Sequence, residues 1–311
     1  MQITINKITI LKFLPAIGLA ILFLIFWINN PHWFWVELWF LLEIVVLTSF
    51  TRTLSLKTGI GTFLMGITVG FGVIYLIGSG FEAINMTKTA RAFIMPLLEE
   101  AAKILPILIT IRLFGGLKKP RLNLSDFIFL GACAGAGFSM LEKYFWDSVY
   151  FPFTYGPHFG STYLFSDALG VYASGEPFGY VGHAAATVFV ALGLGLTYKF
   201  LRSKKPFWLV PVLVAFAWVG IEHIILNYYY TPRGEAFMIF GGGQMTPWII
   251  LIALIATIVF EAVKTNELLK QNTKVSKKLR SAFKQIKDFP SFVGSWSTLR
   301  AVNYLAWLKT K

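Results

Sequence analysis

Long apolar stretches alternate with short polar connections along almost the whole chain. Eight of them reach the roughly 20 residues that a helix needs to cross the hydrocarbon core of a bilayer. They cover residues 9–28, 33–51, 58–79, 91–114, 125–147, 178–201, 206–230 and 246–264. The pattern predicts an all-α fold, a polytopic membrane helix bundle with about eight transmembrane helices.

The composition supports a membrane protein. Of the 311 residues, 56% are hydrophobic and 14% are charged, whereas about a quarter of the residues of soluble domains are charged. The net charge of +13 lies in short loops and in the C-terminal tail, so we expect no nucleic-acid partner. The single cysteine, Cys133, excludes an intrachain disulfide and a cysteine-based metal site.

Basic residues predict the orientation of the bundle, because cytoplasmic loops carry an excess of lysine and arginine. With a cytoplasmic N-terminus, the outer loops hold only Lys88, Arg91 and Arg233. The inner loops then hold Arg52, Lys57, Lys118, Lys119, Arg121, Lys199, Arg202, Lys204 and Lys205. We therefore expect both termini on the cytoplasmic side.

The chain divides into a membrane-embedded domain, 1–264, and a basic cytoplasmic tail, 265–311. Apolar residues recur in the tail, which suits an amphipathic segment on the anionic lipids of the inner leaflet; a solvated, disordered tail is the alternative.

Small residues in 131–137 predict close helix packing, with the fifth helix at the centre. The outer loops 148–177 and 231–245 are either lids or plain surface loops.

Polar residues interrupt four of the apolar stretches. An ionisable group at membrane depth costs about 2.5–3.5 kcal/mol even on the most lenient scale. At 1.5 Å per residue, all four sets lie about 8–12 Å below the outer edge. They are Glu99-Glu100-x-x-Lys103, Phe138-x-x-x-Glu142, His183 and His223-x-x-x-Asn227. Their common depth predicts one polar cavity inside the bundle.

Helical spacing predicts which of these groups can face the cavity and which can support it. Glu99 and Glu100 point about 100° apart, so one can enter the cavity while the other supports it, and Lys103 can reach either. Phe138 shares a helix face with Glu142. By contrast, other acids and imidazoles have no such partners in the sequence and are not assigned to the site; they are His32, Glu37, Glu43, Glu222 and Glu261.

The predicted groups suit the hydrolysis of an amide. Carboxylates and imidazoles can bind and deprotonate water. A histidine and an asparagine on one helix face, as at His223 and Asn227, can donate hydrogen bonds to a developing oxyanion. Because the set contains no serine or cysteine nucleophile, we expect direct attack by water without a covalent intermediate.

The four motifs, in this order on four consecutive helices, resemble those of the PrsW family of bacterial membrane proteases. This family is related to the CAAX prenyl endopeptidases and the bacteriocin-processing enzymes, and the resemblance covers about residues 90–230. It implies an intramembrane peptidase of the bacterial cytoplasmic membrane. The type member makes the first cut in a membrane-anchored anti-sigma factor on the extracytoplasmic side, so a membrane-anchored protein is the substrate to expect here.

The resemblance also implies roles for individual residues. Glu99 is the expected base, assisted by Glu142 and His183, although the choice between Glu99 and Glu100 stays open. Glu100, Lys103 and Phe138 have supporting roles. His223 and Asn227 would stabilise the tetrahedral intermediate. The CAAX relatives usually carry histidine at the position of Glu142, which makes His183 an alternative partner for Glu99.

Three other functions use the same residues. A metal-dependent membrane hydrolase would bind zinc through Glu99, Glu142, His183 and His223, although the sequence contains no His-Glu-x-x-His motif and we expect no cofactor. A proton-coupled transporter would use the acids and imidazoles as a relay, yet the chain shows no internal repeat. A binding protein would keep the bundle and tolerate the loss of Glu99.

Overall fold

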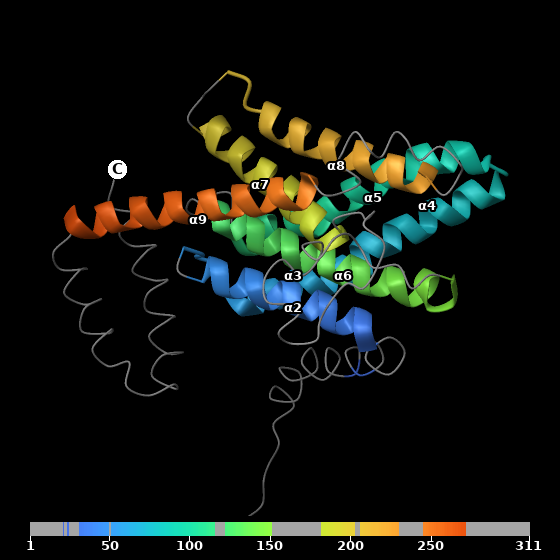
Figure 1. The fold of residues 1–311 in the computed structure, drawn as a ribbon, viewed down its shortest axis with the longest axis horizontal. Helices are drawn as coiled ribbons and strands as arrows, with labels where there is room; N and C mark the ends of the chain where they lie inside the picture. Colours follow the sequence, from blue (N-terminus) through green and yellow to red (C-terminus); the bar gives the residue numbers. More distant parts are fainter. Residues whose placement is uncertain are drawn as a thin grey trace, which may run out of the picture.

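The computed structural model describes Ile21, Leu24 and residues 31–49, 51–115, 122–150, 182–202, 206–229 and 245–271. These residues are mainly helical, with no strand among them, which confirms the predicted all-α class (Figure 1). The elements are α2 (Pro31–Thr48), α3 (Leu56–Met65), the π-helix η1 (Gly66–Phe71), α4 (Gly72–Ala83), α5 (Lys88–Thr110), the π-helix η2 (Ile111–Gly115), α6 (Leu124–Tyr150), α7 (His183–Arg202), α8 (Val210–Tyr229) and α9 (Met245–Gln271).

Three helical segments are long and apolar enough to cross a membrane: Leu56–Ala83, Leu124–Glu142 and His183–Leu201. They support a membrane protein, while the number of eight spans and the cytoplasmic termini stay predictions. α5 carries Glu99, Glu100 and Lys103 in its middle, so composition alone does not mark it as a span. Most of the first predicted span, most of the two outer loops and most of the tail lie outside the described residues.

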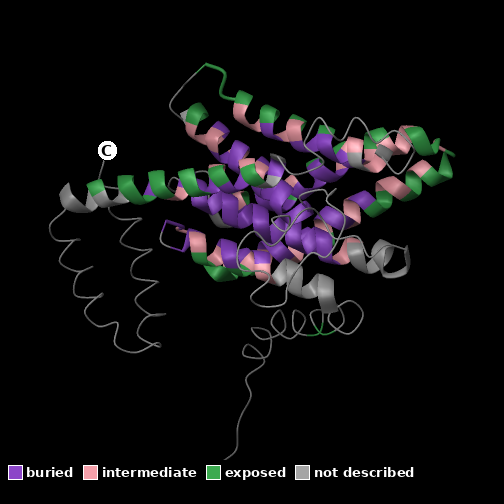
Figure 2. Cartoon of the chain, viewed as in Figure 1, coloured by how far each residue is buried: buried purple, intermediate pink, exposed green. Residues whose placement is uncertain are grey.

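α6 lies at the centre of the bundle, as the small residues predicted. It contacts α2, α3, η1, α5, α7 and α9, and its residues from Leu124 to Met140 are buried (Figure 2). A Cβ atom on Gly137 would lie 2.2 Å from the carbonyl oxygen of Phe63, and one on Gly135 would lie 2.7 Å from that of His183. Because these glycines carry no side chain, the backbones of α3 and α7 can approach α6 directly.

A tight hairpin joins α4 to α5. Asn85 takes a left-handed conformation with φ 51°, which asparagine tolerates better than most residues. The side chain of Thr87 then accepts a hydrogen bond from the backbone N–H of Ala90 at 3.3 Å and caps α5. The hairpin therefore sets the last turn of α4 beside the first turn of α5.

Two buried acids hold the other end of α6. Asp126 accepts hydrogen bonds from the backbone N–H groups of Thr53 and Leu54, at 2.7 and 2.8 Å. Glu261 of α9 accepts from the backbone N–H of Ser125 at 3.1 Å and from Lys199 of α7 at 3.2 Å. Glu261 thus has structural partners although the sequence offers it no motif partner, because backbone groups at a helix N-terminus and a lysine of another helix are not marked by spacing.

Large apolar side chains face outward on α8 and α9. Leu213 and Val214 of α8 and Ile252 and Val259 of α9 each expose more than half of their surface, and these outer faces appear green in Figure 2. A soluble domain rarely exposes apolar patches of this extent. Lipid contact explains them, in agreement with the apolar helices.

The close approach of α3 and α6 generates a stability prediction. We expect Gly137→Ala to lower the free energy of unfolding by about 1–3 kcal/mol or more, because the new methyl group overlaps the Phe63 carbonyl. Gly72→Ala is the matched control, since Gly72 is helical and nothing lies within 4 Å of the added Cβ. Thermal unfolding in detergent measures both; equal melting temperatures for the two variants would contradict the packing.

Candidate active site

α5 supplies a fully buried ion pair. The side-chain nitrogen of Lys103 lies 2.6 Å from Oε1 of Glu100, and both side chains are completely buried. The sequence left open which glutamate Lys103 would choose. The structure pairs it with Glu100, one turn away on the same helix face. Glu99, rotated about 100° from Glu100, is left to point elsewhere.

His183 is the first residue of α7. Gly182 precedes it with φ 87°, a conformation that glycine adopts without strain. The ring of His183 reaches α5 and α6 at once: Nδ1 lies 2.8 Å from Nζ of Lys103, and Nε2 lies 2.6 Å from Oε2 of Glu142. An ammonium group only donates, so Nδ1 accepts from Lys103 and the ring proton sits on Nε2, facing Glu142.

His223 of α8 lies between the two glutamates of α5. Its Nδ1 is 3.0 Å from Oε1 of Glu100, and its Nε2 is 3.5 Å from Oε2 of Glu99. A carboxylate only accepts, so Nδ1 carries the proton and donates to Glu100. In the neutral ring, the lone pair of Nε2 then faces Glu99. Oε2 of Glu99 is buried and makes no hydrogen bond within the described part of the chain.

Glu100 therefore organises the site. Its Oε1 accepts from Lys103 and from His223, and Lys103 in turn fixes the tautomer of His183. The two imidazole rings are consequently held 5.1 Å apart, between their centroids. Four helices, α5 to α8, contribute to this one cluster, and the predicted meeting of the polar residues is what the geometry shows.

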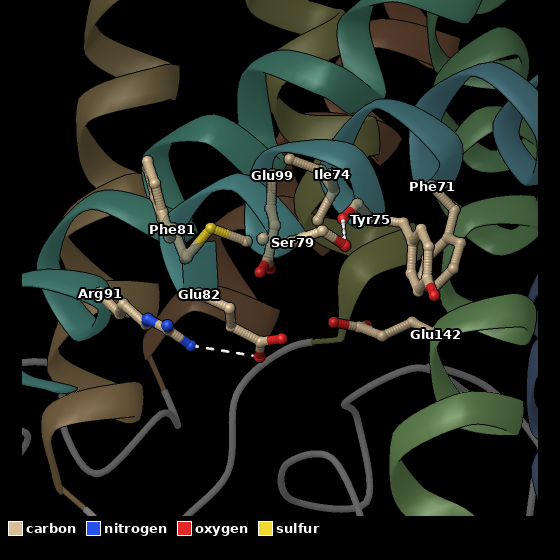
Figure 3. A pocket seen from close by; sticks show the side chains of 11 residues that line it. Phe71, Ile74, Tyr75, Ser79, Phe81, Glu82, Arg91, Glu99 and Glu142 are labelled. Atoms are coloured by element: carbon tan, nitrogen blue, oxygen red, sulfur yellow. Dashed lines mark hydrogen bonds and ion pairs between the residues drawn. The ribbon is translucent and has the colours of Figure 1, made fainter. Parts of the chain in front are cut away.

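A cavity of about 430 Å³ opens beside the cluster. Figure 3 shows the carboxyl groups of Glu99 and Glu142 turned toward this space, with Glu82 and Arg91 at its edge. Glu82 and Arg91 form an ion pair of 3.3 Å across the α4–α5 hairpin. The remaining lining residues are Phe71, Ile74, Tyr75, Gly78, Ser79, Phe81 and Met95.

Phe138 and Asn227, the other two predicted residues, hold different positions. The Phe138 ring is fully buried and packs between the rings of Phe71, at 5.9 Å, and His183, at 5.4 Å, so it supports the histidine as expected. Asn227 is half-buried on α8, one turn beyond His223. No contact within the described residues fixes its amide.

The sequence missed part of the cavity wall. Glu82 and Arg91 flank a connection between two predicted spans, and nothing in their spacing marks them as a pair. A prediction of the short hairpin would have placed them opposite each other. Of the acids set aside, Glu222 is buried next to His223 but does not line the cavity. The side chains of His32 and Glu37 lie outside the described residues.

The cluster resembles a metal site in part. Ligand atoms of Glu99, His183 and His223 all lie within 4.8 Å of one another, and two imidazoles with one carboxylate are a catalytic zinc set. However, the Lys103 ammonium occupies Nδ1 of His183, which places a proton on the Nε2 that a metal would need. Glu99 and His223 fit a metal; His183, in this hydrogen-bond arrangement, does not.

Comparison of the chain with protein families, with curated proteins and with solved structures found no match. A fold alone would in any case not establish an activity.

The buried ion pair generates a second stability prediction. We expect Lys103→Met to lower the free energy of unfolding by about 3–5 kcal/mol, because it leaves the Glu100 carboxylate buried without its cation. The double variant Glu100→Gln/Lys103→Met should recover much of that loss. Denaturant titration in detergent measures all three proteins.

The rim ion pair provides the control. Arg91 and Glu82 are partly exposed, so Arg91→Gln should cost less than about 1 kcal/mol. A Lys103→Met variant as stable as the wild type, or a double variant less stable than either single one, would contradict the pairing.

Proposed function

We propose that this chain is a membrane-embedded endopeptidase that hydrolyses a peptide bond of a membrane-anchored protein with a glutamate- and histidine-activated water. The observation that carries the proposal is the close approach of Oε2 of Glu99 and Nε2 of His223. Both atoms are acceptors, they lie 3.5 Å apart, and Glu99 borders the cavity. A water molecule beside this pair can donate a hydrogen bond to each atom and turn a lone pair toward a substrate carbonyl.

The reaction then needs no further group for its proton balance. Glu99 takes a proton from the water as its oxygen attacks the carbonyl carbon. When the carbon–nitrogen bond breaks, Glu99 returns the proton to the leaving amine. Glu100 is not the base, because it is completely buried and already accepts from Lys103 and His223. Of the two adjacent glutamates, Glu99 is therefore the proposed base.

The distances also change the role proposed for His223. The resemblance implied that His223 stabilises the oxyanion, whereas its Nε2 lone pair faces Glu99 and suits water binding. We assign the oxyanion instead to two N–H donors of the predicted site residues. These are Nε2–H of His183, which points at Glu142, and the amide of Asn227, one turn beyond His223. Glu142 positions the His183 ring and borders the space that the substrate enters.

The cavity suits a piece of polypeptide. Its volume lies in the range of ligand-binding clefts, about 300–1,000 Å³. Aromatic and aliphatic side chains such as Phe71, Ile74 and Met95 form its walls. We include in the proposal what the PrsW resemblance implies: a first cleavage of an anti-sigma-factor-like protein near the extracytoplasmic face of a bacterial cytoplasmic membrane.

A metal-dependent membrane hydrolase is the second candidate, favoured by the mutual distances of Glu99, His183 and His223. Zinc bound by these residues would lower the pKa of its water and supply the nucleophile. The contact between Lys103 and His183 weighs against this candidate, because it occupies the nitrogen that would hold the ring proton of a zinc-bound histidine.

Glu99→Gln should reduce kcat/KM for a membrane-anchored substrate by about 10²–10⁴-fold, because glutamine cannot take the proton. Glu222→Gln is the matched control: it removes a buried carboxyl group next to His223 but outside the cavity, and should stay within about threefold of the wild type. Both variants are checked for folding by gel filtration and thermal unfolding. Normal cleavage by folded Glu99→Gln would refute the assignment.

A chelator separates the two candidates. For the metal-free mechanism we expect cleavage to be unchanged after incubation with EDTA or 1,10-phenanthroline, and the purified protein to hold zinc well below one ion per chain by elemental analysis. Activity that is lost with the chelator and restored by zinc would instead establish the metal-dependent hydrolase.

A further inference from the structure

One face of α4 forms the long wall of the cavity. Its lining residues recur three or four positions apart and therefore share a helix face; they are Ile74, Tyr75, Gly78 and Glu82. The neighbouring Leu76 exposes 72% of its surface but does not line the cavity. The cavity is therefore a groove that follows the axis of α4 over about two turns.

The contacts between α4 and α5 fix how the two walls of the groove face each other. Glu82 forms an ion pair with Arg91. Four residues earlier on α4, a Cβ atom on Gly78 would lie 3.9 Å from Cε of Met95, which is four residues later on α5. The helices of this hairpin are thus antiparallel, and one turn of α4 matches one turn of α5.

The next turn in this register reaches the floor of the groove, where Ile74 lies opposite Glu99. Both residues border the cavity (Figure 3) and expose only 6% and 7% of their surface, whereas Glu82 at the rim exposes 66% of its side chain. Eight residues separate Glu99 from Arg91, which corresponds to about 12 Å along α5. The proposed catalytic water therefore lies about 12 Å below the rim.

The size of the groove decides which conformation of a polypeptide can reach this depth. A helix about 10 Å wide and 12 Å long has a volume of about 900 Å³. The cavity offers about 430 Å³, which is half of that. An extended chain is slimmer and advances about 3.3 Å per residue. About four extended residues therefore cover the distance from the rim to Glu99, whereas a helix would need about eight.

We propose that the groove binds the substrate as an extended segment along α4. The substrates are then membrane-anchored proteins in which at least about four unfolded residues separate the scissile bond from any folded domain on the side of the α4–α5 hairpin. This inference rests on the proposed peptidase function. A folded domain is too large for the groove and stays at the rim, so a shorter connection holds the scissile carbonyl away from the water between Glu99 and His223.

A series of substrates tests the required length. A folded fluorescent domain is joined through one to ten residues to a mapped cleavage site and an apolar span of about 20 residues. We expect kcat/KM to fall at least tenfold when the connection is shorter than about four residues, and to stay constant above that length. The matched control is the shortest substrate with a destabilised, unfolded domain, which should be cleaved like the long ones.

The outcomes of the length series are distinct. A threshold near eight residues would show a helical substrate, and cleavage independent of length would place the scissile bond outside the groove. Either result would overturn the inference and leave the peptidase function standing. Cleavage of no member of the series would instead refute the peptidase function.

Two glycines of α4 test whether the substrate passes along the groove. Gly78 lines the groove between the rim and the floor, so Gly78→Leu should obstruct it and lower kcat/KM at least tenfold. Gly80→Leu is the matched control, because Gly80 does not line the cavity and nothing lies within 4 Å of an added Cβ. It should stay within about threefold of the wild type. Equal kcat/KM values for the two folded variants would overturn the inference.

Cross-linking tests the binding mode without cleavage. The photoreactive residue p-benzoylphenylalanine replaces either Tyr75 or Phe81 in the Glu99→Gln variant, and mass spectrometry locates the peptide residues that it captures. The two positions are about 9 Å apart along α4. The captured residues should therefore lie about three positions apart in the peptide.

A separation of about six positions would indicate a helical peptide and would overturn the inference. Equal capture by a probe at Leu76, outside the cavity, would overturn it as well. Capture with the three-residue separation, combined with no cleavage by the wild type, would support the groove and refute the peptidase function.

Discussion

The ion pair between Lys103 and Glu100 is the interaction on which the site depends. Removing both charges from water costs several kcal/mol per ion, and their attraction often does no more than offset that cost. Two well-packed apolar residues would stabilise the bundle as effectively. The pair does something that apolar residues cannot do: it donates to His183 and accepts from His223. It thereby sets the proton position on both rings, and with it which nitrogen faces each cavity glutamate.

The contrast between Glu99 and Glu100 shows how helix geometry separates two identical side chains. Neighbouring residues of an α-helix point about 100° apart. Glu100 therefore points into the packed centre of the bundle, whereas Glu99 points toward the cavity. This difference matters only because the surrounding helices are held closely. Glycines of α6 let α7 approach until His183, its first residue, contacts α5 and α6 together. The contacts of His183 with the acidic residues therefore depend on the close packing that the small residues of α6 allow.

Much of the fold and of the cluster follows from the sequence. The long apolar stretches predicted helices. The common depth of four residues predicted that these residues meet; they are Glu99, Glu142, His183 and His223. The choice of partners did not follow, because it depends on helix rotations of a few tens of degrees. Lys103 could have reached either glutamate, and His183 was as plausible beside Glu99 as beside Glu142. Glu261 and the Glu82–Arg91 pair escaped notice because their partners lie on other segments, at helix ends and across a hairpin that spacing rules do not join.

The distribution of polar groups along α6 favours a hydrolase over a proton-coupled transporter. At one end Glu142 borders an open cavity. At the other end Asp126 and Glu261 are buried, and donors from the backbone, from Thr53 and from Lys199 bind their oxygens. Between these ends α6 presents mainly apolar and small residues, from Phe127 to Phe138, which are buried throughout. A relay needs titratable groups or water along the whole path, whereas hydrolysis needs water at one end only, and that is where the carboxyl groups of Glu99 and Glu142 border the cavity.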